Sequence, residues 1–180
     1  MTDNAIPGTI VTRILSSDDF KAFWALRLHA LQESPRSFGA SFEESSVMPE
    51  SEAITRLSPA EGSFVLAALR LTNGQEKMIG LVGFQRWPGL KTRHKGLMWG
   101  VYVLPEERGH GVARRMMMET LERCQTIADL EDVNLSVSTT NPSARALYAS
   151  LGFEPYGLER RALKVNGEYC DEELMTKTLA

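Results

Sequence analysis

The sequence predicts an α/β fold in a single domain, with a mixed sheet of about seven strands that carries about four helices on its two faces. Three observations predict this fold. The chain has 180 residues, of which 43% are hydrophobic and 24% charged, as is ordinary for one globular domain with a full core. Segments with alternating apolar residues interchange with segments at helical spacing. Two Asn-Gly pairs, at 73–74 and 166–167, stand between β-rich segments as hairpin turns.

The N-terminal half predicts a strand, two helices and a β-hairpin. Residues 9–15 alternate, and Ser16 or Ser17 can cap the helix that follows, which should end before Pro35. Residues 33–49 mix aromatic and acidic side chains without a clear period and are expected to be irregular. The remaining expected elements are a short helix over 49–57 and strands over 63–71 and 77–87.

The C-terminal half predicts two helices among four strands. Asn141 and Pro142 suit the cap and the first position of one helix, and Gly152 suits its end. The other helix has an inward stripe that consists of Ala113, Met117, Leu121, Cys124 and Ala128. The expected elements in order are a strand over 96–103, a helix over 111–128, a strand over 133–139, a helix over 141–152, and strands over 153–165 and 168–178.

Net charge and cysteine content exclude several classes of protein. The net charge is −3 and the pI about 5.7, which argues against sequence-independent binding of nucleic acid. Cys124 and Cys170 form no metal-binding pair, so no metal site is expected. Residues 1–10 lack the features of a secretory signal, and no apolar segment approaches the roughly 20 residues of a membrane span. A reduced cytoplasmic protein without a membrane partner is therefore expected.

The segment from Trp99 to Met118 is the most informative part of the chain. It predicts a short strand, a polar turn and a glycine-bearing loop that opens an amphipathic helix. Gly109 and Gly111 let backbone N–H groups converge, and the start of a helix favours negative charge. Arg108 stands beside this loop. Such a segment is typical of a pyrophosphate site, although it matches neither the Walker phosphate loop nor the dinucleotide-binding fingerprint.

Two motifs of this half carry a resemblance to a known family. Residues 108–113 read Arg-Gly-His-Gly-Val-Ala, and residues 141–148 read Asn-Pro-Ser-Ala-Arg-Ala-Leu-Tyr, followed by Leu-Gly-Phe over 151–153. In this order, with a helix and a strand between them, they resemble the GNAT superfamily of acyl-CoA-dependent N-acyltransferases, whose phosphate loop reads Arg/Gln-x-x-Gly-x-Gly/Ala. The resemblance implies one GNAT-type N-acetyltransferase domain over 1–180, with a GNAT-like, mostly antiparallel sheet and acetyl-CoA as co-substrate.

The resemblance also implies where the cofactor binds. It places the pyrophosphate on the backbone amides of 108–113, with added charge from Arg108 and Arg114. It places the pantetheine arm beside the strand over 100–103, where an N–H near Val101 would polarise the thioester carbonyl. Asn141 caps its helix and, by the resemblance, contacts the cofactor as well. The implied cofactor-binding residues are Val101, Tyr102, Val103, Arg108, Gly109, His110, Gly111, Val112, Ala113, Arg114, Asn141 and Tyr148.

Tyr148 is the residue expected to take part in the chemistry. Attack of an amine on the thioester ends with loss of a thiolate. Alkyl thiols have a pKa of about 8.5 and tyrosine one of about 10, so a phenol placed near the sulfur can share or donate its proton. At a random position, a tyrosine on the inner face of a helix would be interpreted as packing. The catalytic role of Tyr148 is therefore implied by its place in the second motif.

The sequence does not single out a general base. Many relatives place a carboxylate on the strand before the phosphate loop, and here that strand, GLMWGVYV, has none. The candidates are a water chain or the side chains of Glu43, Glu44, Asp171 and Glu172. The acceptor pocket is expected to form from the segment after the first helix and the closing hairpin, with Phe38, Phe42, Trp87 and Trp99 as candidate lining residues.

Two functions stay open from the sequence. The first is transfer of an acetyl group from acetyl-CoA to a primary amine of a small molecule or peptide, by direct attack through a ternary complex. The second, motivated by the missing strand carboxylate, is a non-catalytic acyl-CoA-binding sensor or interaction module, against which Tyr148 argues. Dimerisation is common among such folds, so a homodimer is among the partners considered.

Overall fold

The computed structural model describes residues 8–57 and 61–179, in which seven strands form one sheet, as the sequence predicts. The strands are β1 (Thr9–Ile14), β2 (Phe64–Thr72), β3 (Gln75–Arg86), β4 (Lys95–Val103), β5 (Asp132–Ser138), β6 (Glu154–Val165) and β7 (Glu168–Thr178). The α-helices are α1 (Phe20–Glu33), α2 (Phe42–Ser46), α3 (Glu50–Ala53), α4 (Val112–Cys124) and α5 (Pro142–Ser150). Short 3-10 helices are η1 (Ser17–Asp19), η2 (Pro35–Ser37), η3 (Ile54–Leu57) and η4 (Pro105–Glu107).

The sheet is mixed and mostly antiparallel, which confirms the prediction. Its strand order is β1-β2-β3-β4-β5-β7-β6, and β4 with β5 is the parallel pair within the described ranges. Both Asn-Gly hairpins are confirmed. Asn73 and Asn166 have φ of 51°, and the glycines after them have φ of 78° and 84°. Positive φ at both central residues is the conformation of the tight turn that suits the twist of paired strands.

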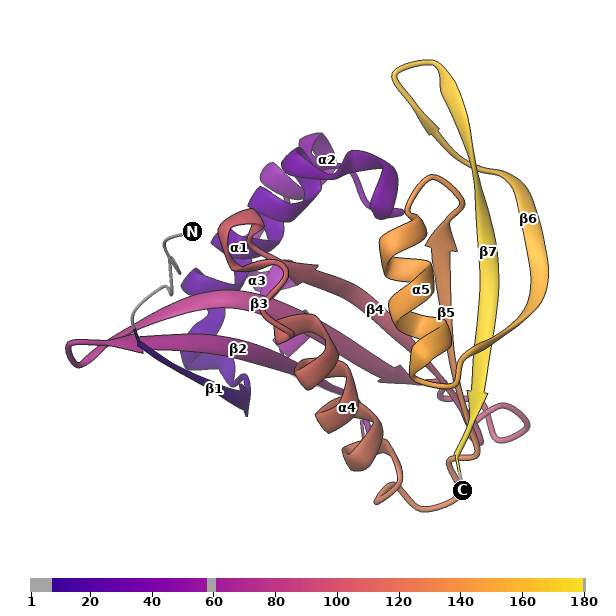
Figure 1. Cartoon of the computed structure of the whole chain (residues 1–180), viewed down its shortest axis with the longest axis horizontal. Coiled ribbons are helices and arrows are strands. Elements are labelled where there is room, and N and C mark those ends of the chain that lie inside the picture. Colours follow the sequence, from indigo (N-terminus) through magenta and orange to yellow (C-terminus); the bar gives the residue numbers. More distant parts are fainter. Residues whose placement is uncertain (1–7, 58–60, 180) are drawn as a thin grey trace, which may run out of the picture.

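Helices cover both faces of the sheet (Figure 1). Two consecutive residues of β3 show this, because successive side chains of a strand point to opposite faces. A Cβ on Gly80 would lie 2.8 Å from Cε of Met116 in α4. Leu81 points the other way, since a Cβ on Gly100 would lie 3.5 Å from its Cδ1 and 3.3 Å from Nη1 of Arg27 in α1. The helices α1 and α4 therefore pack on opposite faces.

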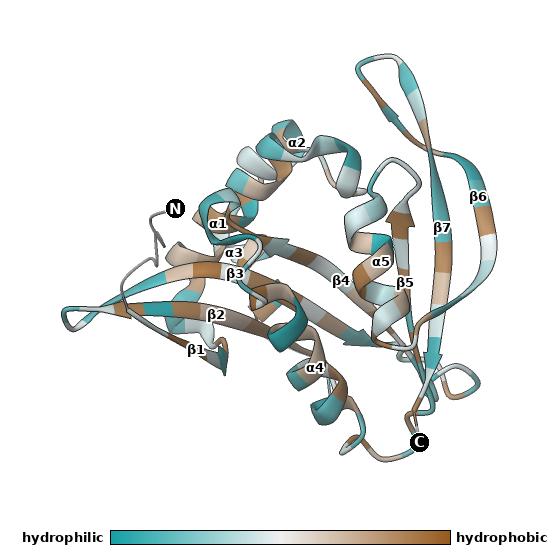
Figure 2. Ribbon diagram, in the orientation of Figure 1, coloured by the Kyte–Doolittle hydropathy of each residue, from teal (hydrophilic) through white to brown (hydrophobic). Residues whose placement is uncertain are grey.

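The core lies on both sides of β2 and β3. Every residue from Phe64 to Arg70 is buried, because helices cover both faces of β2. The apolar run over 64–69 is typical of a strand that is covered on both faces. Figure 2 shows hydrophobic residues along β2 and β3 and hydrophilic residues at the tip of the β6–β7 hairpin. The strand β4 pairs with β3 and is therefore held in place by this core. The candidate site is built on β4.

The predicted helix over 111–128 is too long at its C-terminal end. It ends at Cys124, and Ala128, which the sequence assigns to its inward stripe, is exposed. The hydroxyl of Thr126 donates to the carbonyl oxygen of Arg123 at 2.8 Å. Such local side-chain bonding competes with the helical hydrogen bonds, so the chain turns here toward β5.

The segment over 33–49 is more regular than predicted. It contains η2 and α2, and Ser41 caps α2 by accepting a hydrogen bond from the backbone N–H of Glu44 at 3.1 Å. A serine that satisfies a free N–H at a helix start stabilises even a short helix. The helix expected over 49–57 forms as two consecutive pieces, α3 and η3.

None of the helices in the described ranges is long and apolar enough to cross a membrane. Residues 1–7, over which no secretory signal is expected, lie outside those ranges. Within them, no group of three or more His, Cys, Asp or Glu side chains is placed to hold a metal ion. Cys124 and Cys170 are both buried as free thiols.

Candidate functional site

A cavity opens where β4 and β5 separate. The two strands pair only at their beginnings, Lys95–Leu97 with Asp132–Asn134, and then diverge (Figure 1). The cavity has a volume of about 620 Å³ and is lined by residues of β4, β5, α5 and the segment after α1. Backbone groups at a strand edge can pair with an extended ligand as they would with another strand. The opened edge of β4 is therefore suited to an elongated molecule.

A bulge in β4 lies beside this cavity. Leu81 pairs with Tyr102 and Gly83 with Trp99, so β4 advances three residues while β3 advances two. Gly100 lies within this extra step with φ of 66°, a left-handed conformation that glycine adopts without strain. The bulge re-aims the strand at the point where β5 leaves it. The three strand residues assigned to the cofactor all line the cavity, namely Val101, Tyr102 and Val103.

The loop before α4 presents six consecutive backbone N–H groups. From Gly109 to Arg114, none of them donates to a partner in the part of the chain that the structure describes, and the next, of Arg115, donates to the carbonyl oxygen of Gly111 at 3.0 Å. Gly109 and Gly111 have φ of 81° and 77°, and a Cβ on either would meet no atom within 4 Å. The loop is thus uncrowded, and the positive end of the α4 dipole adds to the attraction of its amides for an anion.

Arg108 lines the cavity, and its side chain binds other residues of the protein. Its Nε donates to the carbonyl oxygen of Val103 at 2.9 Å, and its Nη1 and Nη2 donate to Glu33 at 3.3 and 2.9 Å. The guanidinium also lies over the ring of Tyr102, 5.5 Å from its centroid. These bonds hold the pKa of Glu33 below its usual value. The charge of Arg108 is therefore balanced by Glu33, and the side chain ties the end of β4 to α1.

Tyr148 lies on the inner face of α5 at the cavity. It is 7% exposed, lines the cavity and packs against Phe153 with 6.2 Å between ring centroids. Its hydroxyl makes no hydrogen bond to another described residue. Burial raises the pKa of Tyr148 to about 12. The side chain therefore stays a neutral O–H donor at neutral pH.

Three further residues that are expected at the cofactor lie partly at the cavity and partly outside its lining. Asn141 accepts a hydrogen bond from the N–H of Ala144 at 3.1 Å, which confirms its capping role, and it also lines the cavity. Arg114 is exposed, and its Nη2 donates to Oγ of Ser150 at 2.8 Å, which joins α4 to α5. The ring of His110 lies 3.4 Å from the carbonyl oxygen of Glu107, on the loop and away from the cavity lining.

Of the four side chains considered as general bases, the structure places one at the cavity. Among the described residues that line the cavity, Glu172 carries the one carboxylate, and it is half-buried on β7. Asp171 accepts a hydrogen bond from the N–H of Arg161 at 2.7 Å and does not line the cavity. Glu43 and Glu44 are exposed in α2, outside the cavity lining. Glu172 is thus the sequence candidate that the fold places at the site.

Two of the four aromatic residues that are candidates for the acceptor pocket line the cavity, and two do not. Phe38 and Trp99 line the cavity. Phe42 is partly buried against the core. The backbone N–H of Trp87 donates to the carbonyl oxygen of Lys95 at 3.0 Å, at the start of β4 and away from the bulge. Trp99 packs closely over Gly83 of the neighbouring strand, where a Cβ would lie 2.1 Å from the indole ring. The missing side chain at residue 83 thus makes room for this ring.

We expect Gly83→Ala to lower the free energy of unfolding by about 1–3 kcal/mol, because the new Cβ forces the indole of Trp99 out of its position. The matched control is Gly39→Ala, where a Cβ meets no atom within 4 Å and φ is not positive. Urea denaturation of the three proteins measures the difference. Equal losses in Gly83→Ala and Gly39→Ala would contradict the steric account.

Sequence reasoning missed Arg27, which lines this cavity and a second one of about 410 Å³ beside it. Arg27 is 6% exposed in α1 and lies over the rings of Phe38 and Trp99, with its Cζ 5.1 and 5.6 Å from their centroids. The position of Arg27 in the helix could have indicated that it is buried. Arg27 follows Phe23 by four residues and precedes Leu31 by four, so it falls on the buried face.

Comparisons with known proteins agree with this geometry. Residues 25–153 match the model of the acetyltransferase (GNAT) family. The chain is 30% identical over 103 residues to spermidine N(1)-acetyltransferase of Vibrio cholerae, covering 57% of this chain and 58% of that protein. It is 30% identical over 79 residues to L-amino acid N-acetyltransferase AaaT of Escherichia coli, covering 44% and 49%. The chain therefore spans about half the length of these curated relatives.

Solved structures share the whole architecture. A GNAT-family acetyltransferase from Streptococcus pneumoniae superposes with a TM-score of 0.82 at 20% identity, covering 96% of this chain and all (100%) of that one. The structure of yncA from Salmonella typhimurium, a putative acetyltransferase with its cofactor acetyl-CoA, superposes with a TM-score of 0.79 at 18% identity, covering 95% and 94%. At these identities the likeness concerns the fold. Together with the family match over 25–153, it leads to the conclusion that the chain belongs to the acetyltransferase (GNAT) family.

Proposed function

We propose that the protein is an N-acetyltransferase that moves an acetyl group from acetyl-CoA to a primary amine by direct attack through a ternary complex. The observation that carries this proposal is the row of open N–H groups over 109–114, on the loop that follows the opened strand β4. Several convergent amides at a helix start can bind a diphosphate without large rearrangement. Membership of the acetyltransferase family and the acetyl-CoA in the similar yncA structure support this choice of ligand.

The proposed cofactor lies along the path from the loop to the bulge. Its pyrophosphate is held by the amides of 109–113, and its pantetheine arm pairs with the free edge of β4 at 101–103. Asn141 borders the arm from the start of α5. This placement brings the thioester to the bulge, where an N–H near Val101 stabilises the oxyanion. Loss of one such donor typically costs roughly 3 kcal/mol of transition-state stabilisation.

In the proposed reaction, the amine nitrogen attacks the thioester carbon and forms a tetrahedral intermediate. The C–S bond then breaks, and the hydroxyl of Tyr148 gives its proton to the leaving sulfur, after which the phenolate regains a proton from water. Burial keeps the phenol protonated, with a pKa of about 12, so the proton is present when the sulfur leaves. The same desolvation disfavours a thiolate, so it raises the proton affinity of the sulfur too.

Glu172 is the residue that we propose to accept the proton from the attacking amine, directly or through water. A lysine-type amine has a pKa of about 10.4 and must lose a proton to attack. Glu172 supplies a carboxylate at the cavity although the strand before the phosphate loop has none. The missing strand carboxylate was the argument for a non-catalytic binding module, and a carboxylate at Glu172 weakens that argument. All proposed groups come from one chain, so a homodimer is not required.

The test is release of free thiol from acetyl-CoA in the presence of a panel of amines that includes polyamines, amino acids and peptide N-termini. We expect amine-dependent release for at least one class. Calorimetry with CoA on the same protein shows whether the cofactor site works. Normal binding of CoA without turnover of any amine would favour the non-catalytic acyl-CoA-binding module, and absence of binding would refute both functions.

Gly109→Asp should weaken CoA binding by roughly tenfold or more, about 1.4 kcal/mol, because it puts a negative charge among the amides of the loop. Gly109→Asn is the matched control. Asp and Asn have nearly the same shape, both tolerate positive φ, and a Cβ at residue 109 meets no atom within 4 Å. We expect the Asn variant to bind within a few-fold of the native protein in calorimetry. Equal affinities for the two variants would refute the pyrophosphate assignment.

A further inference from the structure

Arg27 is a buried cation without a counter-charge. Its side chain is 6% exposed, and its Nη1 is fully buried without a hydrogen-bond partner. Across residues 8–57 and 61–179, the structure gives Arg27 neither a hydrogen bond nor an ion pair. A guanidinium has five N–H donors, and removing it from water without replacing those bonds is strongly unfavourable. Such a group is retained at a cost to folding, which points to a ligand that satisfies it.

The described neighbours of Arg27 accept no hydrogen bond from its guanidinium. The rings of Phe38 and Trp99 contact it at distances typical of cation–π packing. Packing against ring faces orients the plane of a guanidinium but accepts none of the bonds that its N–H groups donate within that plane. The N–H groups of the fork therefore lack an acceptor among the described residues, and a planar or tetrahedral anion that reaches them can accept two parallel hydrogen bonds.

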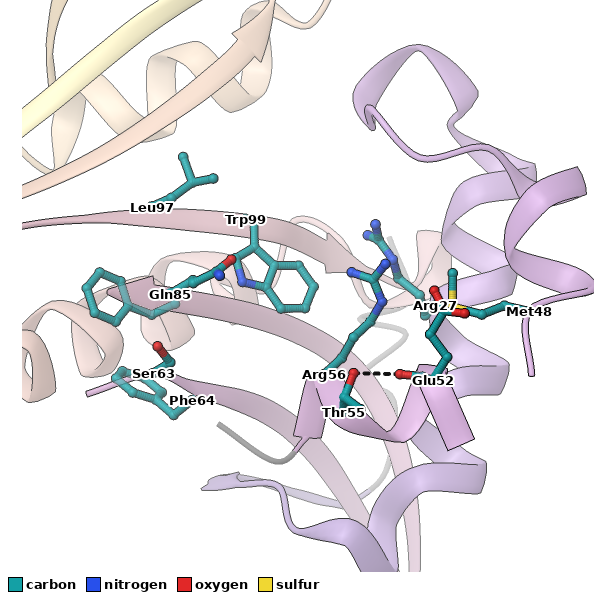
Figure 3. Close-up of a pocket in the computed structure, with 11 residues that line it drawn as sticks. Arg27, Met48, Glu52, Thr55, Arg56, Ser63, Phe64, Gln85, Leu97 and Trp99 are labelled. Atoms are coloured by element: carbon teal, nitrogen blue, oxygen red, sulfur yellow. Dashed lines mark hydrogen bonds between the residues drawn. The ribbon is translucent and has the colours of Figure 1, made fainter. Parts of the chain in front are cut away.

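A second arginine faces the same space. Arg56 of η3 projects into the 410 Å³ cavity together with Arg27 (Figure 3). The lining also contains the polar side chains of Thr55, Ser63 and Gln85. Among the described residues that line this cavity, Glu52 carries the one carboxylate. Glu52 forms no ion pair with either arginine. Burial, and next the charge of Arg56, lower the pKa of Arg27 to about 10, so Arg27 remains charged at neutral pH.

The position of Arg27 connects this charge with the proposed reaction. Arg27 and Trp99 line both cavities, and a Cβ on Gly100 would lie 3.3 Å from Nη1 of Arg27. Gly100 is the bulge residue at which the thioester is proposed to lie. An anion on the guanidinium is therefore near enough to belong to the acceptor whose amine attacks the thioester.

We propose that Arg27, assisted by Arg56, binds an acid group of the acceptor, so that the substrates are amines that also carry a carboxylate or a phosphate-type group. This inference rests on the proposed acetyltransferase function and specifies its acceptor. It separates amino acids and related zwitterions from polyamines, whose charges are all positive. The positive charges of the buried Arg27 and the exposed Arg56 repel a polyamine and attract an acid.

The experiment compares matched acceptors in the thiol-release assay: a set of α-amino acids, their amides, and aminoalkylphosphonates. We expect kcat/KM for at least one acid to exceed that for its amide by tenfold or more. Amine ionisation cannot produce this order, because the amide is the less basic amine and is more often neutral. The carboxylate and phosphonate arms show which acid group the site takes.

Arg27→Met should remove the preference for acids, mainly by raising KM, while CoA binding stays unchanged. It should melt at or above the temperature of the native protein, because a buried charge without a counter-charge is replaced by an apolar chain of similar length. Arg93→Gln is the control, since Arg93 is an exposed arginine paired with Asp129 outside both cavities. If Arg27→Met does not fold, Arg27→Gln and Arg56→Gln provide the same comparison.

The outcomes separate the inference from the function on which it rests. Turnover of amides as fast as of acids, or an acid preference that survives in Arg27→Met, overturns the inference and leaves the acetyltransferase function intact. Absence of turnover with any amine overturns both. Calorimetric binding of the preferred acid to the CoA-loaded protein adds a readout without chemistry, and the loss of that binding in Arg27→Met supports the assignment.

Discussion

Replacing Tyr148 by Phe is expected to lower kcat by roughly 100-fold or more, which is the usual contribution of a positioned general acid. The substitution removes the hydroxyl and keeps the ring that packs against Phe153. The affinity for CoA should change little, because the proposed binding contacts of the pyrophosphate lie on the loop over 109–113. The hydroxyl has no partner among the described residues, so its loss should not lower the melting temperature. Initial rates at saturating acetyl-CoA, with calorimetry and thermal denaturation of the same samples, measure all three quantities.

Tyr156→Phe is the matched control, because Tyr156 is 58% exposed on β6 and lies outside the cavity lining. A kcat for Tyr148→Phe within a few-fold of that of Tyr156→Phe would remove the acid role. The pH profile gives a second check. Burial raises the pKa of Tyr148 to about 12, so the phenol stays protonated well into the alkaline range. At pH values up to about 10, the rate of the native protein should therefore not decline through loss of this proton.

Local features of the sequence were enough to predict most of the fold. The Asn-Gly pairs at 73–74 and 166–167 fixed two hairpins, since turn chemistry depends on neighbouring residues alone. The capping role of Asn141 was also readable, because a cap acts on an N–H three residues away. The end of the helix over 112–124 was not, because no glycine or proline marks it and side-chain bonding of Thr126 competes there.

The candidate site was predicted less completely because its contacts join distant residues. Val101, Tyr102 and Val103, which the resemblance assigns to the cofactor, line the cavity. The partner of Arg108 is Glu33, 75 residues earlier in the chain, and no spacing rule connects them. Arg27 similarly depends on which strand α1 covers. The motifs therefore indicated which backbone segments form the candidate site. The contacts of its charged side chains could be seen only in the folded structure.

Glu107→Ala is expected to lower the free energy of unfolding by roughly 3–5 kcal/mol, the range seen when one partner of a buried ion pair is removed. Glu107 accepts from Nε of Arg70 at 2.8 Å and pairs with Nη2 of the same guanidinium, and the side chains are 2% and 9% exposed. The substitution leaves the Arg70 charge buried without this carboxylate. Because Glu107 directly precedes the loop over 108–113, CoA binding should weaken as well. Urea denaturation and calorimetry measure the two losses.

The adjacent residue provides a close control for this prediction. Glu106 pairs with Lys77 at 3.1 Å, but their side chains are 53% and 63% exposed, so Glu106→Ala should cost less than about 1 kcal/mol. The two variants differ by one position in the same 3-10 helix, and burial is the variable that separates them. Replacing both Arg70 and Glu107 by apolar residues should recover much of the stability, since neither charge of this pair then remains buried. Equal destabilisation by Glu106→Ala and Glu107→Ala would show that this ion pair does not anchor the loop over 108–113, whose amides would then need another support to bind the proposed cofactor.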